Sequence, residues 1–260
     1  MPKVRFKDIY IHFSDQGSGS AVVLLHGFLE GSWMWGEVVK ALAPRYRLIC
    51  VDLPGHGKSD CIGYVHSMDE MAEAVMAVIH SLKLRRVQMV GHSMGGYVAL
   101  AFAERWPDHV KNLILYQSTA RADSPSKKKD RDRVIALVKK NHASFVRQAI
   151  PMLFRPVNRK RFRDGVNWVK NQALKTPVQG IIAALSGMRD RPDREILLKF
   201  PPYPVHIIAG EKDPRIPLQE SVEMSEISEH VRLHLIHGSG HMGYIEAPKQ
   251  TLEALTTALN

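Results

Sequence analysis

The sequence predicts an α/β protein in which a mostly parallel sheet is covered by helices and interrupted by a helical insert. Short apolar segments alternate with amphipathic segments along most of the 260 residues, a pattern typical of strands that alternate with helices. The alternation stops between residues 121 and 199, where the charge also changes. Hydrophobic residues make up 45% of the chain and charged residues 24%, as in ordinary globular proteins with one buried core.

Seven short segments predict the strands, because each is rich in apolar or β-branched residues and ends near Gly, Pro or Asp. The first alternates apolar and polar residues, whereas several others are almost entirely apolar, as in parallel strands that are buried on both faces. The predicted strands are residues 10–15, 21–27, 46–52, 86–92, 110–117, 203–210 and 231–238. Apolar residues at helical spacing predict helices at residues 67–82, 94–106, 217–228 and 244–259.

The positive charge of the chain is concentrated in one segment. Residues 121–199 contain 20 Lys and Arg against 7 Asp and Glu, a net charge of +13, although the whole chain carries only +10. Stretches rich in helix breakers and turn residues bound this segment on both sides. Amphipathic helices are predicted inside it at residues 131–154 and 164–175. We therefore expect a core of residues 1–120 and 200–260 and a helical cap of residues 121–199.

No segment of the chain predicts membrane insertion or export. The apolar runs are shorter than the roughly 18 residues that a membrane span requires, and the first residues lack the apolar stretch of a signal peptide. Cys50 and Cys61 are too few for a disulfide framework, so we expect two reduced thiols. Together these features predict a cytoplasmic protein.

Residues 91–95, Gly-His-Ser-Met-Gly, connect a predicted strand to an Ala-rich predicted helix. Ligands of an open parallel sheet bind beyond the carboxyl ends of its strands, so a polar side chain in this turn is well placed for chemistry. The small flanking residues allow an abrupt turn in which Ser93 takes a strained backbone conformation that lifts its hydroxyl above the sheet. We therefore predict that Ser93 is a nucleophile.

This strand, turn and helix resemble the nucleophile motif of the α/β-hydrolase family, and the resemblance covers nearly the whole chain outside the insert. It implies a mostly parallel sheet of about eight strands, with a helical lid inserted after the sixth strand. It also implies a triad in the chain order serine, acid, histidine. Asp213 follows the predicted strand 203–210, and His241 follows the predicted strand 231–238. The alternative acid is Asp123, because some members of the family carry the acid after the preceding strand.

The resemblance further implies an oxyanion hole made by two backbone N–H groups, those of Phe28 and Met94. The cap is expected to cover the nucleophile and to shape the substrate pocket. The residues expected to wall this pocket are Phe28, Phe145, Met152, Leu153, Phe154 and Trp168. The alternative is that the cap residues among them form the interior of the cap and never contact substrate.

A serine with these partners can hydrolyse a small carboxylic ester or lactone through an acyl-serine intermediate, without a cofactor. Ser93 would attack the carbonyl carbon, His241 would take and return the proton, and Asp213 would orient the imidazole. Carbon–carbon bond hydrolases, thioesterases and perhydrolases share these groups, and a non-catalytic small-molecule receptor is a further alternative. The natural substrate and the oligomeric state stay open.

The sequence argues against metal, dinucleotide and nucleic-acid binding. Four histidines between residues 230 and 241 would form a zinc-like stripe only on a helix, whereas the surrounding pattern favours a strand and a turn. A dinucleotide-binding Gly-x-Gly-x-x-Gly fingerprint is missing. The basic insert interleaves acids with its bases and has few aromatic residues, so we expect a solvated surface there and no nucleic-acid partner.

Overall fold

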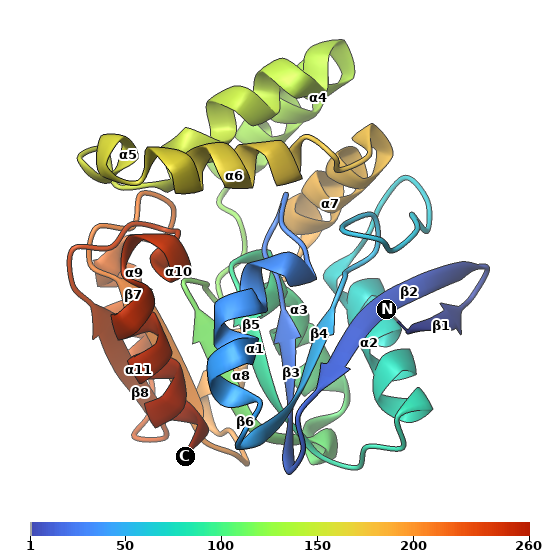
Figure 1. Ribbon diagram of the computed structural model, residues 1–260, viewed down its shortest axis with the longest axis vertical. Helices are drawn as coiled ribbons and strands as arrows, with labels where there is room; N and C mark the ends of the chain where they lie inside the picture. The colour runs from blue at the N-terminus through green and yellow to red at the C-terminus, as the bar shows by residue number, and fades with distance from the viewer. Residues whose placement is uncertain (1) are drawn as a thin grey trace.

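Eight strands form one sheet in the computed structural model, which describes residues 2–260 (Figure 1). The strands are β1 Lys3–Phe6, β2 Ile9–Gln16, β3 Ser20–Leu25, β4 Tyr46–Val51, β5 Val87–His92, β6 Val110–Tyr116, β7 Val205–Gly210 and β8 Val231–Ile236. They are ordered β1-β2-β4-β3-β5-β6-β7-β8, and β2 pairs antiparallel with both β1 and β4. The remaining neighbours are parallel, which confirms the predicted sheet; β1 is the strand that the sequence pattern did not reveal.

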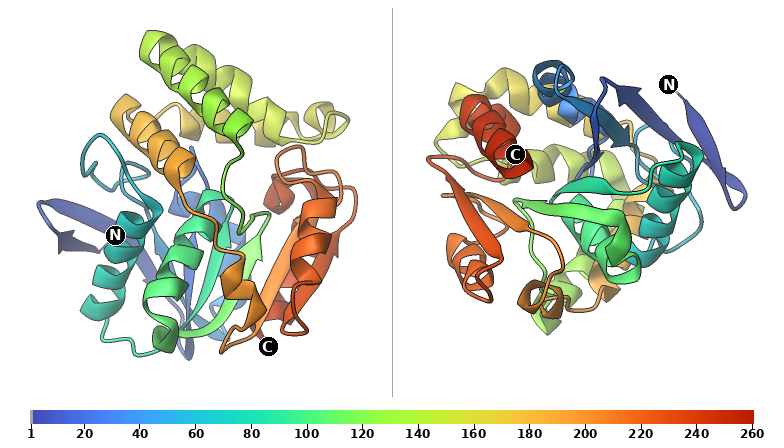
Figure 2. Two further views of the ribbon diagram at one scale, coloured as in Figure 1. Left: turned by 180° about the vertical axis from the view of Figure 1, so that it is seen from behind. Right: turned by 90° about the horizontal axis from the view of Figure 1, so that it is seen from below.

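Helices cover both faces of this sheet (Figure 2). One face carries α1 Gly36–Leu42 and α11 Pro248–Leu259, and the other carries α2 Met68–Ser81 and α3 Met94–Arg105. Because successive side chains of a strand point to opposite faces, Val22 and Leu24 of β3 pack towards α1 and α11, whereas Val23 and Leu25 pack towards α2 and α3. Strand β3 therefore places apolar side chains on both faces of the sheet.

Most predicted helices are present, with two differences. The segment 217–228 is helical only in α9 Leu218–Ser225. The single helix predicted for residues 244–259 is wrong, because the chain forms α10 Gly243–Glu246 and then α11, with non-helical backbone angles at Ala247. Pro248 explains the break, since proline lacks an N–H and disfavours a helical conformation of the residue before it. Short 3-10 helices, η1 Ser32–Trp35 and η2 Pro107–His109, complete the core.

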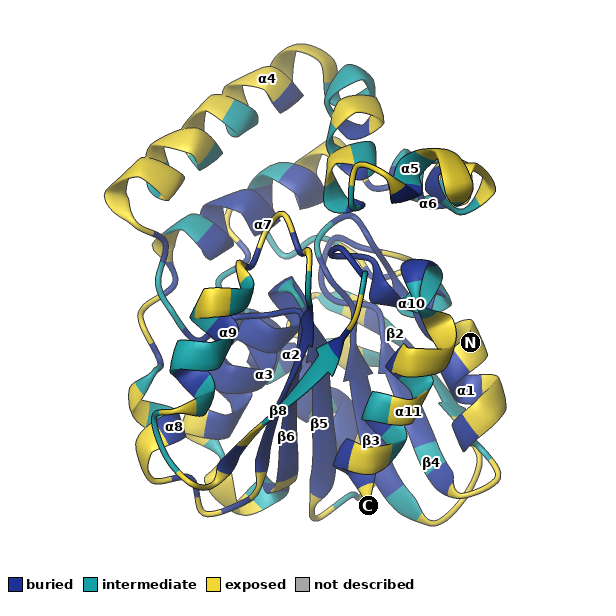
Figure 3. Cartoon of the chain, turned by 90° about the vertical axis from the view of Figure 1, so that its left-hand side faces the viewer, coloured by how far each residue is buried: buried dark blue, intermediate teal, exposed yellow. Residues whose placement is uncertain are grey.

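The segment between β6 and β7 forms a layer of helices over the carboxyl end of the sheet (Figure 1). We term the following elements the cap: α4 Pro125–Ala149, η3 Ile150–Leu153, α5 Asn158–Arg161, α6 Arg163–Ala173 and α7 Val178–Asp190. The chain then leaves the cap, and α8 Ile196–Lys199 lies at the side of the sheet near α9 (Figure 3). Within residues 2–260, no helix is both long and apolar enough to cross a membrane.

The cap helices differ strongly in burial (Figure 3). Helix α7, which the sequence pattern did not reveal, buries most of its residues and approaches the loop after β4 so closely that a side chain at Gly180 would collide with the Gly55 backbone. Helix α4 is bent at Asn141 and buries only Val138 and Val146. Helix α7 therefore packs between α4 and the core, while α4 forms the outer surface of the cap.

Candidate active site

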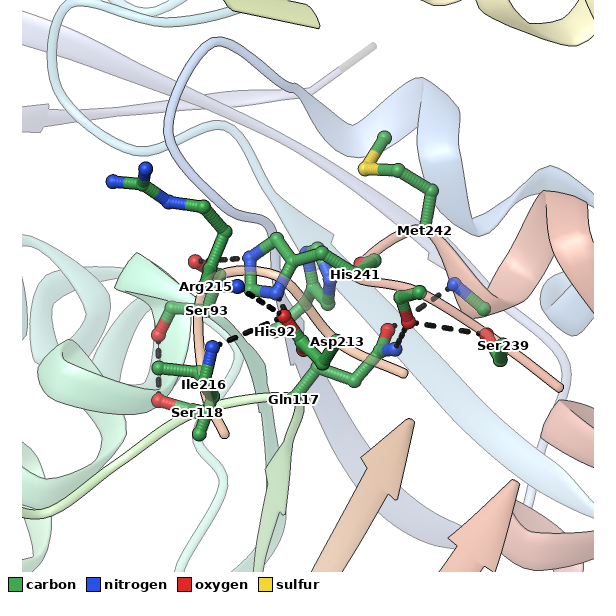
Figure 4. A network of polar contacts seen from close by, with 12 residues as sticks. His92, Ser93, Gln117, Ser118, Asp213, Arg215, Ile216, Ser239, His241 and Met242 are labelled. Atoms are coloured by element: carbon green, nitrogen blue, oxygen red, sulfur yellow. Dashed lines mark hydrogen bonds and ion pairs between the residues drawn. The ribbon is translucent and has the colours of Figure 1, made fainter. Parts of the chain in front are cut away.

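The sharp turn between β5 and α3 presents Ser93 at the carboxyl end of the sheet (Figure 4). Its φ of 49° lies in the left-handed region, which a serine adopts only when its surroundings hold it there. The Ser93 N–H donates to the Tyr116 carbonyl at 3.0 Å, and the Ser118 hydroxyl donates to the Ser93 carbonyl at 2.7 Å. A Cβ at Gly91 would collide with the Gly95 backbone, so the turn requires glycine there.

The structure brings Ser93, His241 and Asp213 together in one hydrogen-bonded row (Figure 4). His241 Nδ1 lies 2.7 Å from Asp213 Oδ2, and His241 Nε2 lies 2.9 Å from Ser93 Oγ. Because an ionised carboxylate can only accept, Nδ1 carries the proton and Nε2 accepts from the serine hydroxyl. Asp213 and His241 follow β7 and β8, which are neighbours in the sheet, so their loops meet at the same edge.

The turn after β7 holds the Asp213 carboxylate in place. Its Oδ1 accepts from the backbone N–H of Arg215 at 2.7 Å and from that of Ile216 at 3.0 Å (Figure 4). This leaves Oδ2 directed at His241, and the side chain is almost completely buried. Two backbone donors on one oxygen therefore orient the other oxygen towards the imidazole.

Asp123, the alternative acid, binds arginines at the start of the cap. Its carboxylate pairs with Arg131 of α4 and lies 2.8 Å from the guanidinium of Arg191, just after α7. Burial by itself would raise the pKa of Asp123, but the two guanidinium groups outweigh that effect and hold the pKa below its ordinary value. Asp123 therefore ties the two ends of the cap together, while Asp213 is the carboxylate that contacts His241.

Buried polar groups that the sequence pattern did not reveal hold the loop of His241. Glu246 accepts from the Gly240 N–H at 3.1 Å, and the Gln117 amide donates to the Gly240 carbonyl. The cap also contributes, because the His241 N–H donates to the Leu153 carbonyl of η3 at 2.9 Å. The loop is thus fixed from both the core and the cap.

The two predicted oxyanion donors lie beside the same turn. Met94 is the first residue of α3, so its N–H has no partner within the helix. The Phe28 N–H donates no hydrogen bond to any residue of the described range 2–260. A Cβ at Gly27 would lie 3.2 Å from Ser93 Cβ, which shows how closely the Phe28 loop approaches Ser93. Both N–H groups are therefore available to an anionic oxygen near Ser93.

A buried acid and histidine lie behind Ser93. Glu30 and His92 are only 2% and 1% exposed, and Glu30 Oε2 lies 2.8 Å from His92 Nδ1. Glu30 also accepts from the Gly27 N–H at 2.7 Å and from the Tyr244 hydroxyl at 3.0 Å. The sequence contained only a faint signal of this pair: a carboxylate in an otherwise apolar loop and a histidine inside the serine turn.

The residues predicted to wall the pocket occupy different environments. Phe154 is completely buried in the main hydrophobic cluster, so it reaches no accessible surface in this conformation. Met152, in contrast, is 56% exposed. The half-buried members of the predicted set are Phe28, Phe145 and Leu153. We leave Phe154 out of the pocket that we propose, because a substrate would have to displace its neighbours to touch it.

Trp168 of α6 in the cap contacts the core. Its ring packs edge-on against Trp33, with the ring centroids 4.8 Å apart. A cavity of about 790 Å³ adjoins this contact and is lined by Trp33, by residues of β2 and α1, and by Gln172 and Lys175 of the cap. Ser93 is not among its lining residues, so this cavity lies beside the hydrogen-bonded row and not above it.

The site combines a serine hydroxyl, an imidazole that contacts it, a carboxylate bonded to that imidazole, and two backbone N–H groups beside the serine turn. These are the groups that acyl transfer requires. Within residues 2–260, no group of three or more His, Cys, Asp or Glu side chains is arranged to hold a metal ion.

Known proteins resemble the chain along most of its length. The family described as alpha/beta hydrolase fold matches residues 20–248. Pimeloyl-[acyl-carrier protein] methyl ester esterase of Nitrosomonas europaea is 30% identical over 250 residues, which cover 92% of this chain and 96% of that protein. A 2-hydroxy-6-oxononadienedioate/2-hydroxy-6-oxononatrienedioate hydrolase of Escherichia coli is 36% identical over 115 residues, 42% of this chain and 40% of that protein.

A solved structure supports the same assignment. A thermophilic esterase from Thermogutta terrifontis has a TM-score of 0.94 and 31% identity, covering 99% of this chain and 97% of that one. The family match, the full-length relative and the eight-stranded sheet with its serine turn agree. The chain therefore belongs to the alpha/beta hydrolase fold family.

Proposed function

We propose that the protein is a serine hydrolase that cleaves a small carboxylic ester or lactone through an acyl-serine intermediate. The observation that carries this proposal is the continuous row from Asp213 through His241 to Ser93, with separations of 2.7 and 2.9 Å. The names of two relatives that match nearly the whole chain support ester cleavage, since one is a methyl ester esterase and the other an esterase.

Acylation begins when Ser93 Oγ attacks the carbonyl carbon of the substrate. The hydroxyl proton moves to His241 Nε2, and the imidazolium that forms is stabilised by the Asp213 carboxylate. The carbonyl oxygen becomes an oxyanion, which accepts hydrogen bonds from the Phe28 and Met94 N–H groups. When the tetrahedral intermediate collapses, His241 returns the proton to the departing alkoxide, and the acyl group stays on Ser93.

Deacylation repeats these steps with water as the nucleophile. His241 Nε2 takes a proton from the water, whose oxygen attacks the acyl carbon and again forms an oxyanion. Collapse breaks the bond to Ser93 Oγ, which recovers its proton from His241, and the carboxylic acid leaves. In a lactone the alcohol and the acid belong to one product molecule.

Hydrolysis of a carbon–carbon bond next to a ketone is the second candidate function. The Escherichia coli relative is named for a 6-oxo dienedioate, a substrate that carries a ketone carbonyl where an ester carries its acyl carbon. Since the same serine, base and anion donors would act on either carbonyl, a comparison of substrates must separate the two.

The test combines a substrate panel with covalent labelling. Wild type, Ser93→Ala and the control Ser186→Ala would be assayed on p-nitrophenyl esters of increasing chain length, a γ-lactone and a 6-oxo dienedioate. A serine-directed organophosphonate should label wild type once per chain at Ser93. Ser93→Ala should lose the labelling and about three or more orders of magnitude of turnover, whereas Ser186→Ala keeps both.

Three results would count against the proposal. Labelling at another residue, with activity retained in Ser93→Ala, would exclude the acyl-serine mechanism. Turnover of the oxo dienedioate alone would favour the second candidate. Saturable binding of esters without turnover would indicate a receptor.

A further inference from the structure

The side chains of Glu30 and His92 are buried beside the turn that carries Ser93. Burial of an ion pair is costly unless hydrogen bonds satisfy both members. Here Glu30 Oε2 accepts from the Gly27 N–H at 2.7 Å and lies 2.8 Å from His92 Nδ1, while Oε1 accepts from the Tyr244 hydroxyl at 3.0 Å. The carboxylate is thus surrounded by donors.

The other ring nitrogen of His92 faces the backbone of His241. Its Nε2 lies 3.0 Å from the His241 carbonyl oxygen, and the two imidazole rings are 5.2 Å apart at their centroids. A carbonyl oxygen can only accept a hydrogen bond, and an ionised carboxylate can only accept as well. Both nitrogens of His92 therefore face acceptors, and only the imidazolium form offers two N–H donors.

The pKa directions of the pair agree with this geometry. Burial by itself would lower the pKa of His92, but the Glu30 carboxylate and the hydrogen bonds outweigh burial and raise the pKa. For Glu30, burial by itself would raise the pKa, but the charge of His92 and the bonds from His92 and Gly27 bring it below its ordinary value. Both shifts favour the ionised pair.

The other titratable groups around the pair do not compete for its charge. Burial lowers the pKa of His26, so that side chain is neutral at pH 7. Burial raises the pKa of both Tyr116 and Tyr244, which keeps the two phenols neutral. The charge of Asp213 raises the pKa of His92 further.

We propose that His92 is an imidazolium at neutral pH and that the Glu30–His92 pair positions the base for hydrolysis. The inference rests on the proposed acyl-serine mechanism. One end of the pair holds Gly27, which precedes the oxyanion donor, and the other end holds the backbone of His241. The pair therefore fixes the oxyanion loop and the base relative to Ser93, and both members act as positioning residues.

Two amide substitutions separate the two donors of His92. In His92→Asn the amide nitrogen takes the place of Nδ1, so the bond to Glu30 can persist while the bond to the His241 carbonyl is lost. In His92→Gln the amide nitrogen reaches the place of Nε2, so the bond to the His241 carbonyl can persist. We expect kcat of His92→Asn to fall by about 10- to 100-fold with KM nearly unchanged, and His92→Gln to restore most of that loss.

A purely structural role gives a different pattern. It predicts that both variants lose activity in proportion to their fall in melting temperature, with no advantage for His92→Gln. That pattern, or two variants with the kcat of wild type, would overturn the positioning role.

The protonation of His92 is measured on the wild-type protein without substrate. In protein labelled with ¹⁵N-histidine, both His92 ring nitrogens should give protonated-type NMR signals at pH 7, assigned by their disappearance in His92→Gln. In Glu30→Gln one of the two should become the unprotonated type. An unprotonated His92 nitrogen in wild type at pH 7 would overturn the proposal.

The two readouts separate failure of this inference from failure of the proposed function. If wild type turns over no ester, or Ser93→Ala keeps its activity, the proposed function is wrong and the positioning role falls with it. If Ser93→Ala is inactive but His92→Asn matches wild type, only the positioning role is wrong.

Discussion

The carboxyl end of the sheet around Ser93 and the outer cap helix α4 differ in whether their polar side chains are buried or solvated. At the sheet edge, Asp213, His241, Glu30 and His92 are buried, and each is held by hydrogen bonds from or to the others or the backbone. Helix α4 extends over 25 residues and buries only two of them, both valines. Buried polar groups depend strongly on their partners, whereas solvated charges are screened. Sensitivity to substitution should follow this difference.

The largest expected effect is a loss of kcat, and it should distinguish the two buried aspartates Asp213 and Asp123. Asp213→Asn should lower kcat by about 10⁴-fold, because an amide would favour the wrong tautomer of His241. Asp123→Asn should leave kcat within about tenfold but lower the free energy of unfolding by about 3–5 kcal/mol, because it leaves Arg191 buried without its anion. Ester hydrolysis and urea unfolding measure the two quantities. The reverse order of kcat values would move the acid to the start of the cap.

Two leucines of the cap, one buried and one exposed, test whether burial also determines the effect of a substitution within the cap. Leu185 of α7 is 3% exposed, whereas Leu137 of α4 is 56% exposed. Leu185→Ala should lower the free energy of unfolding by about 2–5 kcal/mol, because it leaves a cavity in a packed contact. Leu137→Ala should change it by less than about 0.5 kcal/mol. Equal effects in urea unfolding would contradict the view that α7 is closely packed while α4 is solvated.

Selectivity for acyl length should respond to the accessible aromatic residues of the cap. Phe145→Ala or Trp168→Ala should change the ratio of kcat/KM between long and short esters by about tenfold or more. Phe154→Ala is the control, because Phe154 is completely buried and should lower the melting temperature without changing that ratio. If all three variants keep the wild-type ratio, these aromatic residues do not wall the pocket.

The smallest expected effect is the pH dependence of stability at the Glu30–His92 pair. The pKa of Glu30 lies below its ordinary 4.5, so its contribution is complete above pH 4.5 and is lost as pH falls through the native value. The pKa of His92 lies above its ordinary 6.5, so its contribution is complete below pH 6.5 and is lost as pH rises through the native value. The difference in the free energy of unfolding between wild type and Glu30→Gln, measured by urea unfolding, should therefore be greatest between pH 4.5 and 6.5. A difference that is independent of pH would contradict the proposal that the pair is ionised.

Local patterns in the sequence were sufficient for much of the fold. Strand alternation, apolar runs and helical spacing repeat over a few residues, so they revealed the mostly parallel sheet, α2 and α3. The serine turn is equally local. Asp213 and His241 were predicted from the family resemblance, which implies the chain order of the triad, and from their places after strands; the structure brings them to Ser93.

The features that the sequence did not reveal depend on contacts between segments that are distant along the chain. Glu30 and His92 are 62 positions apart, and a lone carboxylate in a loop is ordinarily a solvated group. Phe145 and Phe154 follow the same apolar pattern, yet only the packing of the cap decides that one is half-buried and the other inaccessible. The sequence determined the strand ends and the serine turn because these arise from neighbouring residues. The partners of each buried charge and the accessibility of each cap residue were decided by the tertiary structure, since they depend on which segments the closed chain brings together.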